Sequence, residues 1–293
     1  MRYFVAGFDV AKGTLADDVS DERPYFELGW EVVTTHFDAK RMKKTGQIDS
    51  GRDVIVTCSG REFLYRAEFD RVIDYAEFTR RGADAQDCHW LTGRYAEGRV
   101  PISYFDREPH SPASCYRYLD EDREILQSMA VPDVSALHQG KRYCCFCVRK
   151  RRHGAYRNIT DEVANRVARR LAESYERIFV VGMGAEHLDK PPYVCHVSLQ
   201  TYASLIAQPE CDLVLGTMTG PMQLASVISR ARLCAVIKNY DGYDIDGQNH
   251  PVCLGRCIRL SKSEFRFVDP SDFLSAIEDG ALWRARSGDG APQ

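Results

Sequence analysis

The sequence predicts an α/β protein built from two Rossmann-like domains, each with a parallel sheet covered by helices on both faces. Two observations predict this fold. Short apolar runs alternate with helical segments along much of the chain, as they do in parallel sheets. In addition, 293 residues suffice for two domains of ordinary size. We expect an N-terminal domain over 1–130, a C-terminal domain over 131–280 and a flexible tail over 281–293.

Four apolar runs predict the strands of the N-terminal domain. They are 2–6, 30–35, 53–57 and 71–75. The interval 61–70 predicts one or two turns of helix, and a basic stretch at 40–44 follows the second run. From 80 to 132 no clear period is present, apart from a helix that we expect near 120–128.

The C-terminal domain shows a more regular alternation of strands and helices. Apolar runs predict strands at 143–148, 177–181, 211–215 and 233–237. Thr160 is a capping residue, and an apolar stripe of Val163, Val167 and Leu171 follows it at helical spacing. Further helices are expected at 199–207, 221–230 and 270–279. Such short connections between strands and helices are typical of a doubly wound parallel sheet.

The composition is that of an ordinary soluble globular protein, with 44% hydrophobic and 28% charged residues. The net charge of −3 gives no global attraction to nucleic acid or to anionic lipid. The opening MRYFVAGF is too short for a signal peptide, and no apolar run reaches the roughly 18 residues that span a membrane. We therefore expect a cytoplasmic protein without a membrane span.

Eleven cysteines raise the question of a metal site. Cys144 and Cys147 have C-x-x-C spacing, and Cys253 and Cys257 have C-x-x-x-C spacing, which both loosely suggest zinc. The first pair, however, lies in an apolar run that predicts a buried strand, and strand alternation points its two side chains to opposite faces. We expect buried free thiols and no metal site, with zinc as the alternative.

The turn Thr217-Met218-Thr219-Gly220-Pro221 connects an apolar run to a predicted helix. In parallel sheets, ligands bind beyond the carboxyl ends of the strands. A helix that begins there presents unpaired N–H groups and the positive end of its dipole to an anion. Thr217 and Thr219 offer hydroxyl groups, while Gly220 allows a close approach of the backbone. The pattern predicts either a phosphate site or an ordinary strand-to-helix turn capped by Thr219.

A basic stretch follows the first strand of the same domain, with five cations within 149–157. Planar guanidinium groups suit bidentate recognition of phosphate. Arg149, Arg152 and Arg157 are therefore candidate phosphate ligands, expected at the same sheet edge as Gly220. A solvated basic loop and a contact with nucleic-acid phosphates are the alternatives.

A G-x-G sequence, Gly182-Met183-Gly184, follows the second strand of this domain. The third glycine of a dinucleotide fingerprint is missing, and the prolines within 189–192 block the helix that should follow. The pattern therefore argues against a dehydrogenase and favours a loop beside a nucleobase or ribose.

The order of these segments resembles the C-terminal nucleotide-sugar domain of GT-B glycosyltransferases, most closely the heptosyltransferase-like family 9. The stretch SLQTYASLIAQPECDLVLGTMTGPMQLAS at 198–226 carries the likeness, and 149–184 supports it more loosely. Together they cover somewhat under half of the chain. Where the family commonly has Asp-Ser/Thr-Gly, this chain has Met218-Thr219-Gly220, and Gln223 replaces a frequent histidine. These departures leave the identity of the donor open.

The resemblance implies a donor site for a nucleotide-diphosphate sugar, a co-substrate used without cofactor or metal. It implies that the turn at 219–222 approaches the diphosphate, that Arg149 or Arg152 neutralises this group as it leaves, and that Met183 and Gly184 flank the nucleoside. With the candidates from the two loops, the expected donor-binding residues are Arg149, Arg152, Arg157, Gly182, Met183, Gly184, Thr217, Thr219, Gly220, Pro221 and Met222.

An inverting transferase also needs a base that takes the proton of the acceptor hydroxyl. In the resembled family this base is an aspartate on the loop after the first strand. Here that loop contains Asp9, Asp17 and Asp18, and its stretch GTLADD loosely matches the family's glycine-containing motif. Asp17 is the first candidate and Asp9 the second.

The leading hypothesis is a metal-independent, inverting glycosyltransferase that moves a hexosyl or pentosyl group to an acceptor hydroxyl. The acceptor is a saccharide, a lipid-linked glycan or a modified base of DNA or another nucleic acid. A sugar-nucleotide epimerase on the same fold is the first alternative, and a non-catalytic nucleotide-binding module is the second.

Overall fold

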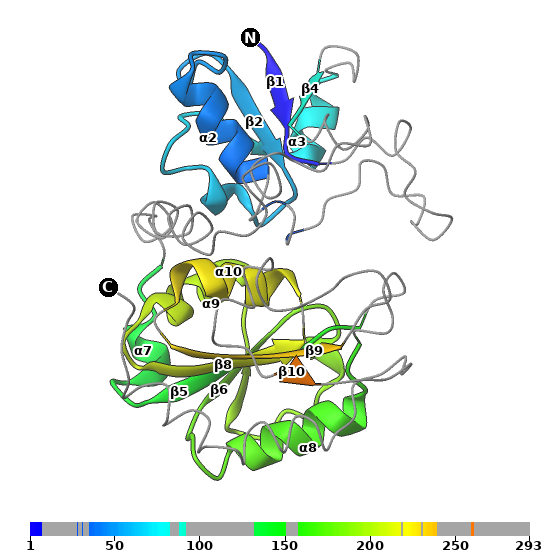
Figure 1. Cartoon of the computed structure of the whole chain (residues 1–293), viewed down its shortest axis with the longest axis vertical. Helices are drawn as coiled ribbons and strands as arrows, with labels where there is room; N and C mark the ends of the chain where they lie inside the picture. Colours follow the sequence, from blue (N-terminus) through cyan, green and yellow to red (C-terminus); the bar gives the residue numbers. More distant parts are fainter. Residues whose placement is uncertain are drawn as a thin grey trace. The chain divides into compact units, whose positions relative to one another are not determined.

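The structure is a computed structural model (Figure 1). It describes residues 1–7, 28, 31, 35–82, 88–91, 132–150, 158–217, 219–229, 231–238 and 259–260. The chain divides into two compact units, Met1–Pro132 and Asp133–Gln293.

The first unit contains a four-stranded parallel sheet with the order β3-β2-β1-β4. Its strands are β1 (Tyr3–Val5), β2 (Val54–Thr57), β3 (Val72–Asp74) and β4 (Cys88–Trp90). Helix α2 (His36–Lys44), the 3-10 turn η2 (Glu62–Leu64) and helix α3 (Tyr75–Arg80) accompany them. The strands expected at 2–6, 53–57 and 71–75 and the helical turn within 61–70 are confirmed, whereas the sequence does not predict β4 or α3.

The strand expected at 30–35 is wrong. Glu31 and Thr35 are helical, and Thr35 leads directly into α2. Glu31, Thr35 and His36 are all buried. Tertiary burial has therefore overridden the preference of the β-branched residues for a strand.

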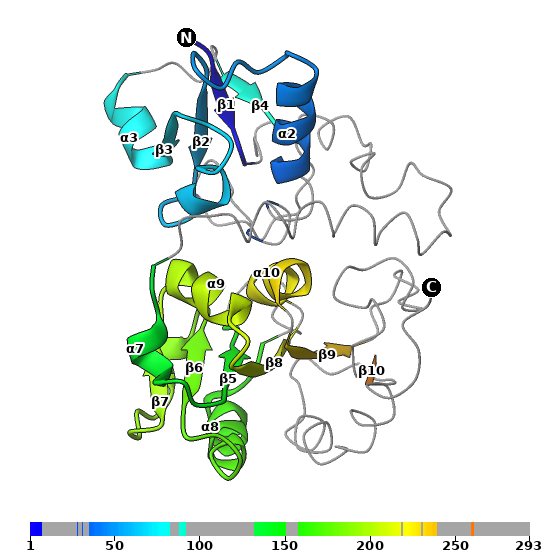
Figure 2. The ribbon, with the colours of Figure 1, turned by 90° about the vertical axis from the view of Figure 1, so that its left-hand side faces the viewer.

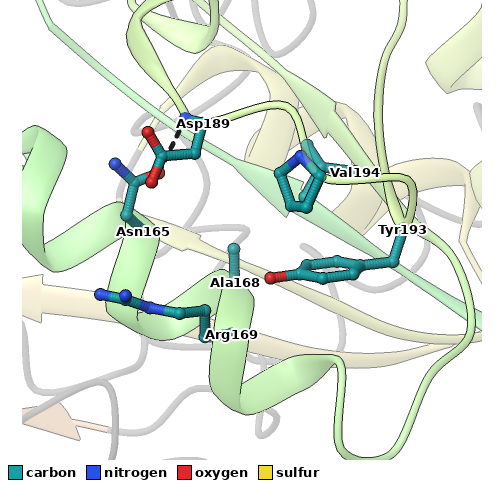
Figure 3. Close-up of a pocket in the computed structure, with 7 residues that line it drawn as sticks. Asn165, Ala168, Arg169, Asp189, Tyr193 and Val194 are labelled. Carbon is teal, nitrogen blue, oxygen red and sulfur yellow. Dashed lines mark hydrogen bonds between the residues drawn. The ribbon is translucent and has the colours of Figure 1, made fainter.

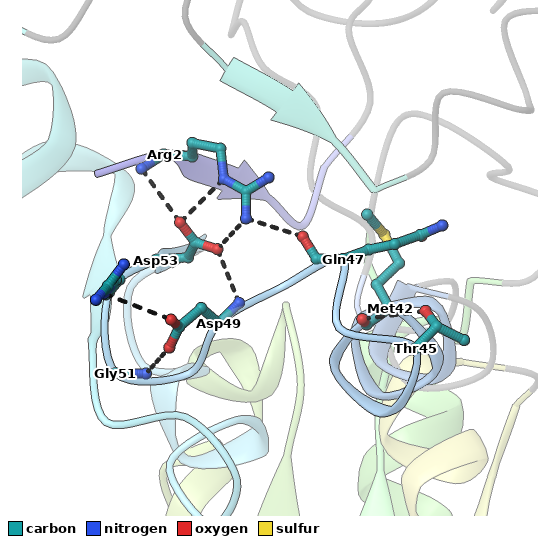
Figure 4. A network of polar contacts seen from close by, with 8 residues as sticks. Arg2, Met42, Thr45, Gln47, Asp49, Gly51 and Asp53 are labelled. Carbon is teal, nitrogen blue, oxygen red and sulfur yellow. Dashed lines mark hydrogen bonds and ion pairs between the residues drawn. The ribbon is translucent and has the colours of Figure 1, made fainter.

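A polar network joins the amino ends of β1 and β2 (Figure 4). The guanidinium of Arg2 donates to both carboxylate oxygens of Asp53, over 3.1 and 2.6 Å, and also to the carbonyl of Gln47. The backbone N–H of Asp49 donates to Asp53 as well. The hydrogen bond from Arg2 is the main reason that the pKa of Asp53 lies below its usual value.

The second unit contains a six-stranded parallel sheet with the order β10-β9-β8-β5-β6-β7. Its strands are β5 (Tyr143–Cys147), β6 (Ile178–Val181), β7 (Val194–His196), β8 (Cys211–Thr217), β9 (Arg232–Lys238) and β10 (Arg259–Leu260). Numbered from β5, this is the 3-2-1-4-5-6 order of the Rossmann fold. The first unit repeats the 3-2-1-4 part of the same order.

Helices cover both faces of this second sheet. They are α7 (Ser135–His138), α8 (Asp161–Leu171), the 3-10 turn η5 (Ala185–His187), α9 (Leu199–Ala207) and α10 (Gly220–Ile228). Figures 1 and 2 show α8 on one face and α9 and α10 together on the other. Thr160 caps α8 by accepting from the N–H of Val163, and the stripe of Val163, Val167 and Leu171 is buried, as predicted.

The cysteines of β5 are buried on both faces of the sheet. Cys144 belongs to the core cluster beneath α8, whereas the thiol of Cys147 lies 3.2 Å from the hydroxyl of Tyr202 on α9. The two therefore point to opposite faces, and burial raises the pKa of Cys147 to about 12. Within the described residues no group of three or more His, Cys, Asp or Glu could hold a metal ion. Cys253 and Cys257 lie outside the described residues.

Most strands and helices predicted for the second unit are confirmed. The helix at 199–207 has both predicted ends, and the strands at 143–148, 177–181, 211–215 and 233–237 are present. The sequence does not predict α7, β7 or β10. The helices expected near 120–128 and 270–279, and the tail 281–293, lie outside the described residues. Among the described helices none is long and apolar enough to cross a membrane.

Candidate functional site

The candidate site lies where the strand order of the second sheet reverses. From β5 the chain proceeds to β6 and β7 on one side, and from β8 to β9 and β10 on the other. Strands β5 and β8 are parallel neighbours, with Cys147 opposite Gly216. The segments that follow these two residues therefore emerge at the same edge of the sheet. Such a switch point is where open α/β sheets bind their ligands.

Helix α10 begins at this edge. Its N-cap is Thr219, whose hydroxyl accepts from the N–H of Met222 over 3.4 Å. Pro221 lies in the first turn, and its carbonyl accepts from the hydroxyl of Tyr202, which fixes the start of α10 against α9. The first N–H groups of a helix lack partners within the helix, and the helix dipole favours an anion here. The predicted helix start at Gly220 and Pro221 is thus confirmed in position.

The hydroxyl of Thr217 is buried at the end of β8 without a hydrogen-bond partner. The residue is 1% exposed, and no group in the described chain bonds its Oγ1. An unpaired buried hydroxyl costs roughly 1–3 kcal/mol. Thr217 is two residues before the N-cap of α10, so a hydrogen-bonding group without a partner lies close in sequence to the start of this helix.

Arg149 emerges from the neighbouring strand at the same edge. The side chain is 4% exposed, and its Nη1 donates to the neutral amide oxygen of Asn158 over 2.6 Å. The carbonyl of Arg149 accepts from the N–H of Ile159, which holds the two ends of the basic stretch together. Lys150 instead pairs with Asp161 at the start of α8. Arg152 and Arg157 lie outside the described residues.

Gly182 and Gly184 allow a close backbone contact that the sequence does not reveal. Both have positive φ, 118° and 98°. A β-carbon at Gly182 would lie 2.1 Å from the carbonyl oxygen of Val148, and one at Gly184 would lie 2.5 Å from Cβ of Lys150. Only glycine lets the segment after β6 run this close to the segment that carries Arg149.

The same segment does not form a dinucleotide-binding helix. The 3-10 turn η5 follows Gly184, and Leu188 returns to an extended conformation. Met183 is 60% exposed at the carboxyl end of β6, which leaves an apolar side chain at the edge where the candidate site lies.

Two further residues at this edge were not found from the sequence. Gly216 lets β8 approach β5, because a β-carbon there would lie 2.6 Å from the carbonyl oxygen of Cys147. His196 ends β7, its Nε2 has no partner in the described chain, and burial lowers its pKa. No strand is predicted at β7 from the sequence, so this histidine was not a candidate.

The candidate bases Asp9, Asp17 and Asp18 lie outside the described residues. The structure shows instead a buried ionic group at the carboxyl end of β2. Glu31 accepts from the hydroxyl of Thr57 and pairs with Nη1 of Arg61 at 2.8 Å. Burial raises the pKa of Glu31, while Arg61 opposes that rise.

Comparison with known proteins places this geometry in a known fold. No protein-family model and no curated protein matches the sequence. The structure is similar to a family 9 glycosyl transferase from Veillonella parvula DSM 2008, with 12% identity, TM-score 0.50 and coverage of 97% of this chain and 98% of the other. It is also similar to the E. coli heptosyltransferase WaaC with ADP-2-deoxy-2-fluoro heptose, with 12% identity, TM-score 0.50 and coverage of 95% and 99%.

At this identity the likeness shows the fold alone. The expected fold class, two Rossmann-like units of the GT-B type, is confirmed, and so is the expected likeness to family 9 glycosyltransferases.

Proposed function

We propose that the protein is a glycosyltransferase that moves a sugar from a nucleotide-diphosphate sugar to an acceptor hydroxyl. One observation carries this proposal: Arg149 follows β5, and Thr217, whose hydroxyl has no partner among the described residues, ends β8 just before the N-cap of α10, at the sheet edge where the strand order reverses. A guanidinium, a hydroxyl and free backbone N–H groups are the donors that bind a pyrophosphate.

The proposed reaction is a direct displacement at the anomeric carbon of the donor sugar. The acceptor oxygen forms a bond to this carbon while the bond to the β-phosphate oxygen breaks. The acceptor proton passes to a carboxylate, for which Asp17 is the first candidate, before Asp9 and Asp18. Arg149 and the start of α10 stabilise the charge that develops on the leaving diphosphate. Such a displacement inverts the anomeric centre.

The fold supports this proposal, because the similar E. coli protein binds an ADP-sugar analogue. In the present chain the nucleoside would extend from the switch point toward β6, where Met183 is exposed. The proposal does not depend on a particular nucleobase, and the hexosyl or pentosyl nature of the sugar is likewise left to experiment.

A saccharide or lipid-linked glycan is the proposed acceptor class. Two basic stretches, 40–44 and 141–157, favour a nucleic-acid acceptor in the sequence; the first lies on α2, and residues 151–157 of the second lie outside the described residues. Lys43, however, donates to the carbonyl of Glu68 and lies 5.4 Å from the ring centroid of Phe69, so it packs against its own unit. We therefore do not retain a nucleic-acid base as the proposed acceptor.

A thermal-shift screen of nucleoside diphosphates and nucleotide sugars tests donor binding, because a ligand that binds only the folded state raises its stability. We expect Thr217→Val and Arg149→Lys to weaken binding of the best ligand by about tenfold, which is the loss of roughly 1.4 kcal/mol from a hydrogen bond to phosphate. Arg166→Ala, an exposed arginine on α8, is the matched control and should bind as the parent does.

Turnover of the identified donor then distinguishes a transferase from an epimerase and from a non-catalytic module. Release of nucleoside diphosphate that requires an added glycan supports the transferase. Isomerised or hydrolysed donor in the absence of any acceptor supports an epimerase, and binding without turnover supports a non-catalytic module. Unchanged affinity in both Thr217→Val and Arg149→Lys would contradict the proposed site.

A further inference from the structure

A small cavity lies on the flank of the second unit, between helix α8 and the loop that leads to β7 (Figure 3). Its volume is about 170 Å³. Asn165, Ala168 and Arg169 line it from the helix, and Asp189, Pro191 and Tyr193 line it from the loop. Tyr193 immediately precedes β7, so the cavity lies toward the amino end of that strand. The candidate donor site lies at the opposite, carboxyl edge of the same sheet, and the two are separate.

The walls of this cavity are held in place by the fold. The side-chain oxygen of Asn165 accepts from the backbone N–H of Asp189 over 3.0 Å and ties the loop to the helix. A tight turn closes from Pro191 to Val194, whose N–H donates to the proline carbonyl over 2.9 Å. Tyr193 packs against the core beneath α8. A site whose walls are already fixed loses little entropy when a ligand binds.

The charged groups that line the cavity have no ion-pair partner in the part of the chain that the structure describes. Arg169 and Asp189 line the same space, yet within the described chain they form no ion pair with each other or with another residue. The hydroxyl of Tyr193, which points toward Ala168 in Figure 3, has no hydrogen-bond partner there either. By contrast, Asp161, which is also on α8, forms an ion pair with Lys150. The guanidinium and the carboxylate therefore remain available for a ligand.

This lining suits a ligand that both donates and accepts hydrogen bonds around an apolar body. A carboxylate accepts from two neighbouring hydroxyls, and the planar guanidinium donates to two oxygens. The ring of Tyr193 and the ring of Pro191 supply a flat apolar wall. A pyranose ring has this combination, with hydroxyls at its rim and C–H groups on its faces. The cavity is smaller than the roughly 300–1,000 Å³ of drug-sized sites, which limits the ligand to about one ring.

We propose that this cavity is a saccharide-binding subsite that holds one sugar ring of a glycan, apart from the donor site. The inference goes beyond the proposed function, because it rests on the lining and not on any transfer reaction. A glycan bound here would be tethered to the second unit independently of its reacting end. Tethering would raise the local concentration of other parts of the same glycan.

NMR titration of the full chain with neutral sugars tests the subsite directly. The probes are glucose, galactose, mannose and N-acetylglucosamine, and the observables are the backbone amide shifts of Ala168 and Val194, which line or adjoin the cavity. We expect at least one sugar to shift these signals with saturation. Arg169→Ala and Asp189→Asn should each weaken the binding of that sugar by about tenfold, because each variant loses one charge-assisted hydrogen bond.

Arg166→Ala is the matched control, since Arg166 is exposed on α8 but does not line the cavity. It should leave sugar affinity unchanged. All three variants should retain the parent's thermal shift with its nucleoside diphosphate, which shows that the second unit is folded and that the donor site is intact. Three results would overturn the proposal: no sugar shifts the signals, free glycine shifts them instead, or the two cavity variants bind sugar like the control.

Discussion

Replacing Gly182 by alanine tests the close packing that positions Arg149. The backbone of Gly182 has a φ of 118°, a conformation that costs a non-glycine residue about 1–3 kcal/mol. The new β-carbon would also lie 2.1 Å from the carbonyl oxygen of Val148. Since this neighbour is backbone, the segments after β5 and β6 must separate by about 1 Å or more to restore an ordinary contact of 3.5 Å or so.

Gly140→Ala is the matched control for this substitution. Gly140 lies in the same unit and has a φ of 71°, but a β-carbon there would meet no atom within 4 Å. It therefore carries the backbone strain without the clash, and we expect a cost of about 1–2 kcal/mol. For Gly182→Ala we expect strain plus displacement, about 3–5 kcal/mol, which corresponds to a fall in the midpoint of thermal unfolding of roughly 6–20 °C.

Two measurements separate strain from displacement. Thermal unfolding followed by circular dichroism gives the stability of both variants, and calorimetric titration gives the affinity of the best nucleoside diphosphate. We expect Gly182→Ala to lose affinity as well as stability, because the segment that must move carries Arg149, whereas Gly140→Ala should lose stability alone. The packing argument is refuted if Gly182→Ala costs no more than Gly140→Ala and binds the ligand equally well.

Two predictions concern the charged groups of the first unit. Because the pKa of Asp53 is lowered in the folded protein, its pairing with Arg2 stabilises the fold above the usual carboxylate pKa, and this contribution is lost as the pH falls through the lowered value. Asp53→Asn should therefore be less stable than the parent in urea at pH 7, with a difference that shrinks below about pH 4; a difference independent of pH would contradict this. Arg61→Ala should destabilise by about 3–5 kcal/mol, because it leaves the buried carboxylate of Glu31 without its cation. The double variant Glu31→Gln, Arg61→Met should cost less in the same urea titration, and an equal or larger loss would show that the charge is not the cause.

Local signals in the sequence were sufficient for much of the second unit. Thr160 and Ser198 each accept from an N–H in the first turn of their helix, so α8 and α9 begin where the side-chain chemistry requires. The apolar runs of β5 and β6 are buried throughout, as continuous runs in parallel sheets are. The helix start at Gly220 and Pro221 was predictable for the same reason, since capping and a first-turn proline depend on neighbouring residues only.

Other features depended on contacts between distant parts of the chain. The β-branched run before α2 predicts a strand, but Glu31 and Thr35 are helical. Glu31 also contacts Thr57 and Arg61, which are distant in sequence, and no local pattern predicts that contact. From the sequence alone, the G-x-G pattern indicates a loop that binds a nucleotide. In the structure Gly182 also has a packing role, because the backbone of Val148 lies too close to it for any side chain.

The sequence by itself determined the fold class, the ends of several helices and the residue types of a phosphate site, because caps, prolines and apolar periodicity act over a few residues. Only the tertiary structure decided that β8 lies beside β5. This pairing puts the segment that carries Arg149 and the start of α10 at the same edge of the sheet, and it buries the hydroxyl of Thr217, which has no partner in the part of the chain that the structure describes. Strand order is set by which apolar faces pack together across some 70 residues of intervening chain, and no short stretch of sequence contains that information.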